Sequence, residues 1–169
     1  MKIKTKAEDI KRMSQVVKKV ELDELFLLRS EVWRSIDALE YPQVGAELTF
    51  AGKLIKAQEK QFTARVEFAL KGTADSKKDN GGEGEKVEVV KLSVDYVLVY
   101  SLADGSQFSK EDLESFCHVN AVYNAWPYWR EFVQSSTGRM QLPTLMLPLL
   151  KLARPNGAGE KPQECDAEA

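Results

Sequence analysis

Residues 124–132 read NAWPYWREF, and residues 136–143 read STGRMQLP. Proline has no N–H to donate and its φ is fixed, so Pro127 either opens a helix or kinks a longer one. Gly138 is well placed to end that helix in the left-handed conformation. The two stretches together therefore predict a helix that is followed by an extended segment.

The aromatic residues of this helix fall into two neighbouring rows. Trp126, Trp129 and Val133 follow the spacing i, i+3, i+7, while Tyr128 and Phe132 follow the spacing i, i+4. Polar residues occupy the other side. A strongly amphipathic helix is typical of an element that covers a sheet, and this is the simplest interpretation of the apolar flank.

Length and composition limit the class of protein. The chain has 169 residues and a hydrophobic content of 43%, which suits one domain with a core. Its 24 basic and 26 acidic residues give a net charge of −2, so no global positive field draws nucleic acid. No apolar run is long enough to cross a bilayer, and polar residues follow the basic residues 1–6 where a signal peptide would be apolar. We expect a cytoplasmic protein without nucleic-acid binding or membrane insertion.

The residues that most often carry chemistry are scarce. Cys165 lies in a polar tail, so a disulfide with Cys117 is not expected. The only histidine, His118, is adjacent to Cys117, and neighbouring helical residues point about 100° apart, which makes a poor chelate. We therefore predict no catalytic residue, no metal and no cofactor, and a chain that is not an enzyme.

Periodicity divides the chain into three parts. Residues 1–19 form an N-terminal extension in which residues 7–19 are either an amphipathic helix or a frayed, charged segment. Residues 20–152 form the domain, and residues 153–169 have the Pro, Gly and acidic composition of a disordered tail.

Within the domain, strand signals come first and helix signals last. Strands are expected over residues 20–34, 47–57, 61–71 and 86–100. Ser109 and Asp112 then resemble a capping box, and a helix over about residues 110–125 leads to the Pro127 helix. This order predicts an α+β fold, a four-stranded antiparallel sheet with helices packed on one face.

The predicted sheet has more apolar surface than one covered face needs. In residues 20–34, Val20, Leu22 and Val32 share one phase of the strand, while Leu25 and Leu27 lie in the other phase. The connection over residues 35–45 is also unusually apolar for a loop. The excess predicts either contact between subunits or a surface that binds other chains.

The helix motif resembles that of the SecB family of protein-export chaperones. That family carries an aromatic-Pro-Tyr-x-Arg-Glu signature, here residues 126–131, and then a Gly and a Leu/Phe-Pro segment, here Gly138 and residues 142–143. The order of strands, apolar crossover and helices is also similar to SecB. The resemblance implies an ATP-independent chaperone, a dimer of dimers, that holds unfolded polypeptides in apolar grooves.

Carried over by position, the resemblance assigns two sets of residues. The groove that binds the client would be lined by Ile36, Leu39, Tyr41, Val44, Leu145, Leu147, Leu149 and Leu150. The helix that packs on the sheet and builds subunit contacts would contribute Trp126, Tyr128, Trp129 and Phe132.

Two partners beyond unfolded clients follow from the resemblance. Export chaperones present an acidic sheet face to the SecA motor, but the outward positions here mix Lys53 and Arg65 with Glu67 and Asp95. The N-terminal extension and the Gly-Arg-x-x-Leu-Pro helix exit look more like SecB-like chaperones that guard antitoxins. SecA and an antitoxin are both retained as candidate partners.

Two other classes of protein remain open from the sequence. An oligomeric structural or adaptor domain would hide all of its apolar surface on assembly. A small-ligand or enzymatic α+β domain would instead need a buried polar constellation, for which the sequence offers only Cys117, His118 and scattered acidic residues.

Overall fold

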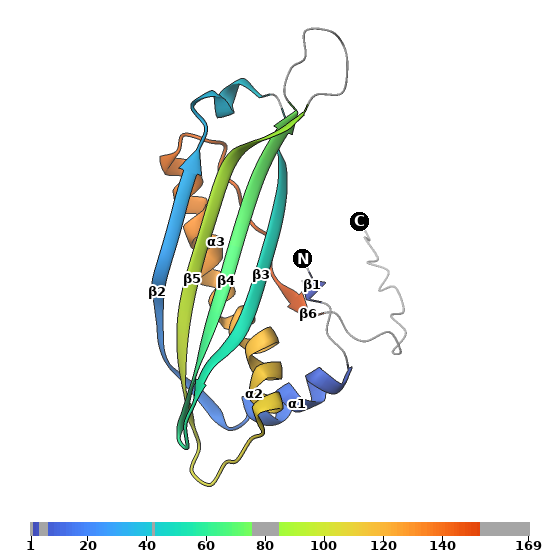
Figure 1. Ribbon diagram of the computed structural model, residues 1–169, viewed down its shortest axis with the longest axis vertical. Helices are drawn as coiled ribbons and strands as arrows, with labels where there is room; N and C mark the ends of the chain where they lie inside the picture. Colours follow the sequence, from blue (N-terminus) through green and yellow to red (C-terminus); the bar gives the residue numbers. More distant parts are fainter. Residues whose placement is uncertain (1, 4–6, 42, 76–84, 153–169) are drawn as a thin grey trace, which may run out of the picture.

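The computed structural model describes residues 2–3, 7–41, 43–75 and 85–152 (Figure 1). The tail predicted over residues 153–169 lies outside the described residues, and the division of the chain at residues 19 and 152 stays a prediction. In chain order the elements are β1 (Lys2–Ile3), α1 (Ala7–Val17), β2 (Val20–Arg34), the 3₁₀ turn η1 (Ile36–Glu40), β3 (Gly45–Ala57), β4 (Gln61–Asp75), β5 (Lys86–Leu102), α2 (Lys110–Phe116), the π-helical turn η2 (Cys117–Ala121), α3 (Val122–Arg139) and β6 (Lys151–Leu152).

The main sheet has four antiparallel strands in the order β2-β5-β4-β3. The helical run α2-η2-α3 covers one face of it, which confirms the predicted α+β fold (Figure 1). A second, two-stranded sheet was not predicted. In it β1 pairs in parallel with β6, so that Lys2 lies opposite Lys151.

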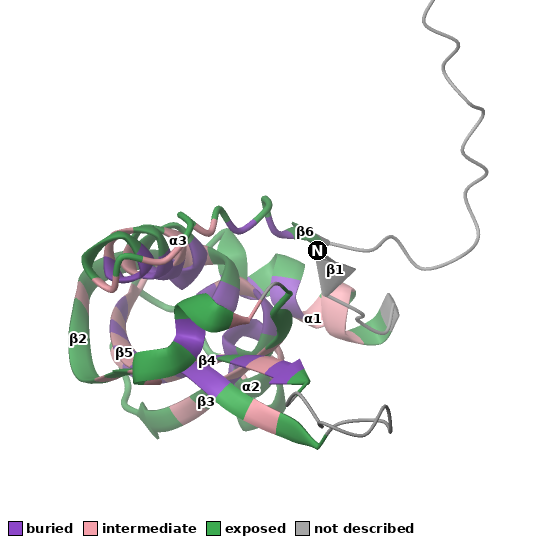
Figure 2. Ribbon diagram, turned by 90° about the horizontal axis from the view of Figure 1, so that it is seen from above, coloured by how far each residue is buried: buried purple, intermediate pink, exposed green. Residues whose placement is uncertain are grey.

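The two central strands show why one face is buried. Along β4, residues from Phe62 to Leu70 alternate between buried and half-buried, as the sequence predicted. Along β5, residues from Val90 to Tyr100 alternate in the same way. Because directly paired residues share a face, the buried side chains of both strands form one floor under the helices (Figure 2).

The predicted phases of β2 are wrong, because two bulges interrupt the strand. The register shifts between residues 22 and 24 and again between residues 27 and 29. As a result Leu25 pairs with Leu98 and Leu27 with Tyr96, on the helix-facing side together with Val32. Phe26 pairs with Val97 and lies on the outer face. The bulges thus collect most of the apolar residues of β2 on one face.

The helical run begins at the predicted capping box. The Ser109 Oγ accepts from the Asp112 N–H at 3.1 Å, and the Asp112 carboxylate accepts from the Ser109 N–H at 3.1 Å. Pro127 lies inside α3, which rules out the interpretation that it opens a helix. Its missing N–H leaves the Tyr123 carbonyl without its usual intrahelical donor.

The exit of α3 corrects the prediction for Gly138. This glycine is helical, and the left-handed residue is Gln141, with a φ of 55°. The Leu142 N–H donates to the Thr137 carbonyl and the Gln141 N–H to the Gly138 carbonyl, both at 3.1 Å, which is a Schellman motif. The longer helix places the partly buried Leu142 against the core, and this packing outweighs the conformational preference of Gly138.

The centre of the core is the contact between α3 and β4. The Trp129 ring is fully buried and stacks on Phe68, with centroids 5.5 Å apart and an interplanar angle of 5°. Trp126 meets the same Phe68 edge-on at 5.8 Å. On the other side of the helical run, α1 packs against α2 and buries Met13 and Val16.

A glycine lets the edge strand β3 touch the helical run. A Cβ built on Gly52 would overlap the carbonyl oxygen of Cys117 and lie 2.9 Å from the Val122 Cγ2. This close approach occurs at η2, where the widened π-helical turn displaces the backbone from regular α-helical positions. Only glycine fits at this crossing.

We predict that Gly52→Ala destabilises the protein by about 1–3 kcal/mol or more, because the added methyl group must push β3 away from η2. Gly45→Ala is the matched control in the same strand, since its nearest neighbour would be 3.7 Å away. Urea denaturation of both variants measures the difference. Equal stabilities would contradict the packing described here.

Candidate functional site

An apolar groove of about 360 Å³ opens between the connection from β2 to β3 and the exit of α3. We call it the crossover groove. No charged side chain is among the residues that line it. They are Ala38, Leu39, Tyr41, Val44, Ala46, Leu70, Gly72, Val90, Thr137, Leu142, Pro143 and Leu145.

The first wall of the groove is the crossover segment, residues 35–44. Ser35 caps η1 by accepting from the Asp37 N–H at 3.4 Å, which starts a tight turn directly after β2. The turn buries Ala38 against the core and turns Leu39 outward, with 57% of its surface exposed. Tyr41 is half-buried and Val44 is 44% exposed, so this wall presents apolar side chains to solvent.

The second wall follows α3 and is held by Thr137. Its buried hydroxyl donates to the Val133 carbonyl at 2.9 Å and accepts from the Leu145 N–H at 3.3 Å. Leu142 is placed in the same wall by the Schellman motif. Gly72 lies between the walls and has no side chain to fill the groove. A Cβ at this position would come within 3.1 Å of Val44 and 3.2 Å of Val90.

The eight residues expected in the groove are divided by the structure. Leu39, Tyr41, Val44 and Leu145 line it together. Ile36 is 91% exposed and Leu149 is 63% exposed, and neither is part of the lining. Leu147 and Leu150 are buried in the core and do not reach the groove.

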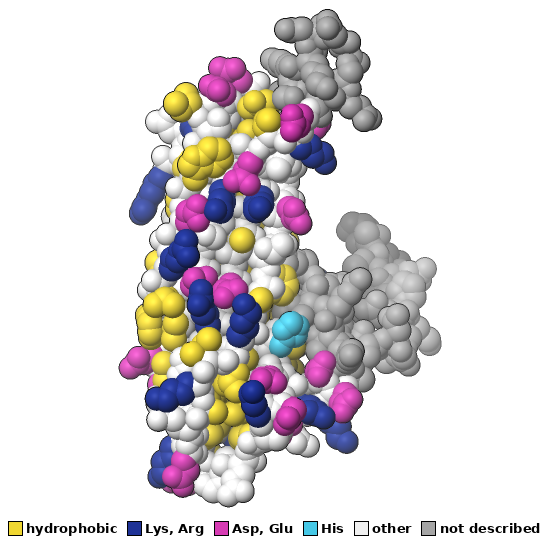
Figure 3. Space-filling view, viewed as in Figure 1, with side chains coloured by type: hydrophobic (Ala, Val, Ile, Leu, Met, Phe, Trp, Pro, Cys, Tyr) yellow, Lys and Arg dark blue, Asp and Glu magenta, His cyan; other side chains and the backbone are white. Residues whose placement is uncertain are grey.

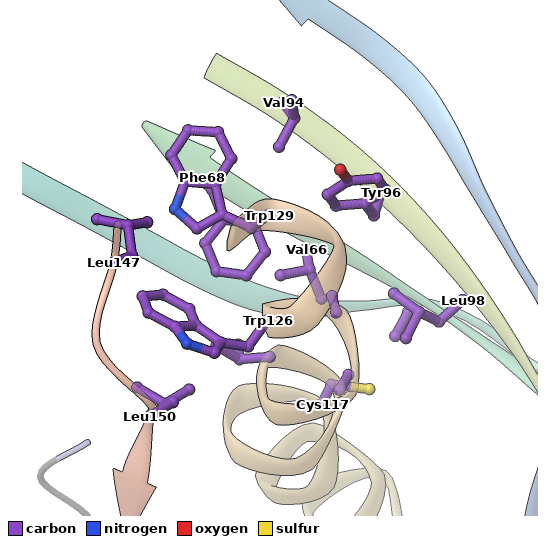
Figure 4. Packing of buried hydrophobic residues seen from close by; sticks show 14 of the residues in the cluster. Val66, Phe68, Val94, Tyr96, Leu98, Cys117, Trp126, Trp129, Leu147 and Leu150 are labelled. Atoms are coloured by element: carbon purple, nitrogen blue, oxygen red, sulfur yellow. The ribbon is translucent and has the colours of Figure 1, made fainter. Parts of the chain in front are cut away.

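The burial of Leu147 and Leu150 results from how α3 holds the segment after it, which we call the strap (residues 140–152). The Arg130 Nε donates to the Leu147 carbonyl at 2.8 Å, and the Trp126 Nε1 donates to the Pro148 carbonyl at 3.1 Å. Figure 4 shows Leu147 and Leu150 on either side of the Trp126 ring. Arg130 of the sequence motif therefore fixes the strap within the subunit.

The four aromatic residues expected on the packing helix are also divided. Trp126 and Trp129 are 3% and 0% exposed and pack inside the subunit. Phe132 is half-buried against Trp129, at a centroid distance of 5.8 Å. Tyr128 is 49% exposed and lies 6.3 Å from the Tyr96 ring, and burial raises the pKa of Tyr96 to about 12.

A second apolar surface runs along the edge strand β2. Leu22, Leu27 and Val32 face the helix side but remain about half exposed, and Phe26 and Trp33 are similarly exposed on the outer face. One long edge of β2 has no partner strand among the described residues. Such an edge is open to pairing with another chain.

The outer face of the sheet is charged and internally paired. Arg65 bridges to Asp95 at 2.7 Å, and Lys91 to Glu31 at 2.8 Å. The hydrogen bond from Lys91 lowers the pKa of Glu31 below its ordinary value. Figure 3 shows basic and acidic side chains interspersed over this face, so neither sign dominates it.

The thiol of Cys117 lies in the interior of the subunit. Burial raises the pKa of the Cys117 thiol to about 12, which disfavours the reactive thiolate. Within residues 2–3, 7–41, 43–75 and 85–152, no group of three or more His, Cys, Asp or Glu side chains could hold a metal ion. In the same ranges no helix combines the length and apolar character required to cross a membrane.

Sequence reasoning missed several groove residues. Leu142 and Pro143 belong to the quoted motif and could have been added from it, since they follow the helix directly. Thr137 and Gly72 gave no signal, because a helical threonine and a strand glycine become groove residues only when the crossover segment folds over them.

Comparison with protein-family models and with curated proteins finds no match. Among solved structures, the chain is similar to the Mycobacterium tuberculosis Rv1957 SecB-like chaperone in complex with a ChAD peptide from the Rv1956 HigA1 antitoxin. The TM-score is 0.67 and the identity 17%, over 85% of this chain and 99% of that chain. A protein of unknown function from Streptococcus agalactiae aligns at a TM-score of 0.37 and 14% identity, over 78% of this chain and 98% of that chain. The chain therefore has the α+β fold of a SecB-like chaperone.

Proposed function

We propose that the protein is an ATP-independent cytoplasmic chaperone that holds unfolded polypeptide segments in the crossover groove. The observation that carries the proposal is the groove itself, which is free of charged side chains and lined by the exposed Leu39 and Val44 and the half-buried Tyr41. An apolar surface that stays exposed on a monomer commonly marks an interaction site. The fold shared with a SecB-like chaperone supports the same function.

In the proposed mechanism the client is bound and released without chemical turnover. Leucine, valine and tyrosine side chains can repack around different apolar segments, so the groove reads hydrophobicity and extended shape and not one sequence. Contacts of this kind are weak singly. A client that engages the grooves of several subunits gains affinity through effective concentration, without any new type of contact.

Among possible clients we favour an antitoxin over an exported preprotein. The similar chaperone from Mycobacterium tuberculosis binds an antitoxin peptide, which supports a client of that kind here. The charges on the outer sheet face pair with one another, through Arg65, Asp95, Lys91 and Glu31. A face without net acidic character gives little support for docking to SecA.

We also propose that copies of the protein associate through β2 and the exposed side of α3, and that the resulting oligomer is a dimer of dimers. Leu27 and Val32 on β2 are each 47% exposed on the helix-facing side, and Tyr128 on α3 is 49% exposed. Tyr96 lies between them, since it pairs with Leu27 and contacts the Tyr128 ring. These side chains would be removed from water by a second copy of the chain.

The groove predicts a separation between binding and assembly. Leu39→Asp and Tyr41→Asp place a charge in an apolar groove, so we expect each to weaken capture of a chemically unfolded model protein by about tenfold or more, with the oligomer intact. Light scattering of the diluted model protein, with no ATP present, measures the suppression of aggregation.

Ile55→Asp is the matched control for Leu39→Asp, because both side chains are 57% exposed but Ile55 is outside the groove. Equal loss in the control and the groove variants would contradict the proposed site. The same assay is repeated with a fragment of an antitoxin as a second client. If the wild-type chain suppresses the aggregation of neither client, the proposed chaperone activity is wrong, and an adaptor domain without chaperone activity replaces it.

The proposed assembly surface predicts that substitutions at the neighbouring residues Leu27 and Phe26 have different effects on the mass of the oligomer. Leu27→Asp should yield smaller oligomers, because it buries a carboxylate at the helix-facing side of β2. Phe26→Asp has nearly the same exposure, 45% against 47%, but lies on the outer face and should assemble normally. Size-exclusion chromatography with light scattering reports the mass of each. Identical masses for both variants and the wild type would remove β2 from the interface.

A further inference from the structure

Arg34, the last residue of β2, holds together two segments that lie far apart in the sequence. Its Nε donates to the Ser35 carbonyl at 3.1 Å and its Nη2 to the Ile36 carbonyl at 3.2 Å. Its Nη1 donates to the carbonyl of Met140, the residue that caps α3. All three acceptors belong to the main chain, so the contact depends on backbone position and not on the neighbouring side chains.

These acceptors are the starting points of the two groove walls. Ser35 and Ile36 begin the crossover segment, which continues to Leu39 and Tyr41. Met140 begins the strap, which continues to Leu142 and Leu145. Arg34 itself does not line the groove. One guanidinium group therefore contacts both walls at the points where they leave the sheet and the helix.

The chemistry of the position favours arginine. Helix C-termini leave carbonyls without intrahelical donors, and a cation there is also favoured by the helix dipole. The planar fork of arginine can address separate carbonyls at the same time, whereas a lysine ammonium is a single point of charge. Only the fork can join the crossover to the helix exit in this way.

We propose that Arg34 is a positioning residue that sets the separation of the two walls of the crossover groove and keeps the groove open for an extended segment. The proposal rests on the proposed function for its binding consequence, but the structural part is independent of any client. Loss of the fork should release each wall locally and leave the β4 and α3 core in place.

The test compares Arg34→Met, which keeps the aliphatic length, with Arg34→Lys, which keeps the charge without the fork. Arg29→Met is the matched control on the same strand, with its side chain on the outer face. Hydrogen exchange with mass spectrometry follows the amides of Ala38 and Leu145, one in each wall. Ala38 donates to the Ser35 carbonyl at 3.3 Å, and Leu145 to Thr137.

We expect both Arg34 variants to exchange about tenfold faster or more at the two walls, with β4 and the centre of α3 unchanged. Unchanged exchange at both walls would overturn the proposal. A uniform increase that includes β4 would do so as well, because it would indicate a general contribution to stability. Arg34→Lys decides by the same measurement if Arg34→Met does not fold.

The second readout is fluorescence anisotropy of a labelled synthetic peptide rich in leucine and phenylalanine and free of charged residues. We expect about tenfold weaker binding by the Arg34 variants and wild-type binding by Arg29→Met. Faster exchange at the walls with unchanged affinity would overturn the role in binding. If the wild type binds neither this peptide nor an unfolded protein, the proposed function fails, and hydrogen exchange still decides whether Arg34 anchors the walls.

Discussion

The position of α3 across the sheet depends on the flat contact between Trp129 and Phe68. A fully buried indole stacked at 5.5 Å on the middle of β4 fixes the helix over the central strands. A helix is only about 10 Å wide, so one helix cannot cover four strands. The uncovered regions are the edge strand β2 and the end of the sheet beneath the crossover segment. Both apolar surfaces of the subunit are therefore a consequence of where this one helix lies.

The crossover groove and the β2 edge differ in the hydrogen bonding of their main-chain groups. Several main-chain groups of the walls of the crossover groove are hydrogen-bonded within the subunit, by Arg34, Thr137 and the Schellman motif, and the lining side chains are uncharged. The β2 edge offers main-chain donors and acceptors as well as apolar side chains. The first arrangement suits reversible contact with varied segments, and the second suits a permanent partner with a matching edge.

The fold class could be predicted from the sequence because each strand and helix carries its own periodicity, as the alternation of Phe62 to Leu70 and the capping box at Ser109 illustrate. The predictions that were wrong concern features that depend on packing between segments far apart in the sequence. The bulges of β2 exchange the faces of Leu25 and Leu27, and the Schellman turn sits at Gln141 instead of Gly138. In the groove, the crossover residues were assigned by position from the SecB resemblance, and of these Leu39, Tyr41 and Val44 line the groove while Ile36 does not. Leu147 and Leu150 were assigned in the same way but are turned inward by hydrogen bonds from Arg130 and Trp126 to the strap, which no local pattern reveals.

The small parallel sheet formed by β1 and β6 joins Lys2 and Ile3 to the end of the strap at Lys151 and Leu152. The strap is thus fixed at its start by the exit of α3, along its length by hydrogen bonds with α3, and at its end by residues from the opposite terminus of the described chain. Because Arg130 and Trp126 already hold the strap at Leu147 and Pro148, loss of those few N-terminal residues would release only its last residues, which would gain conformational entropy. The strand β1 is thereby thermodynamically linked to the end of the strap, more than a hundred residues away in the sequence.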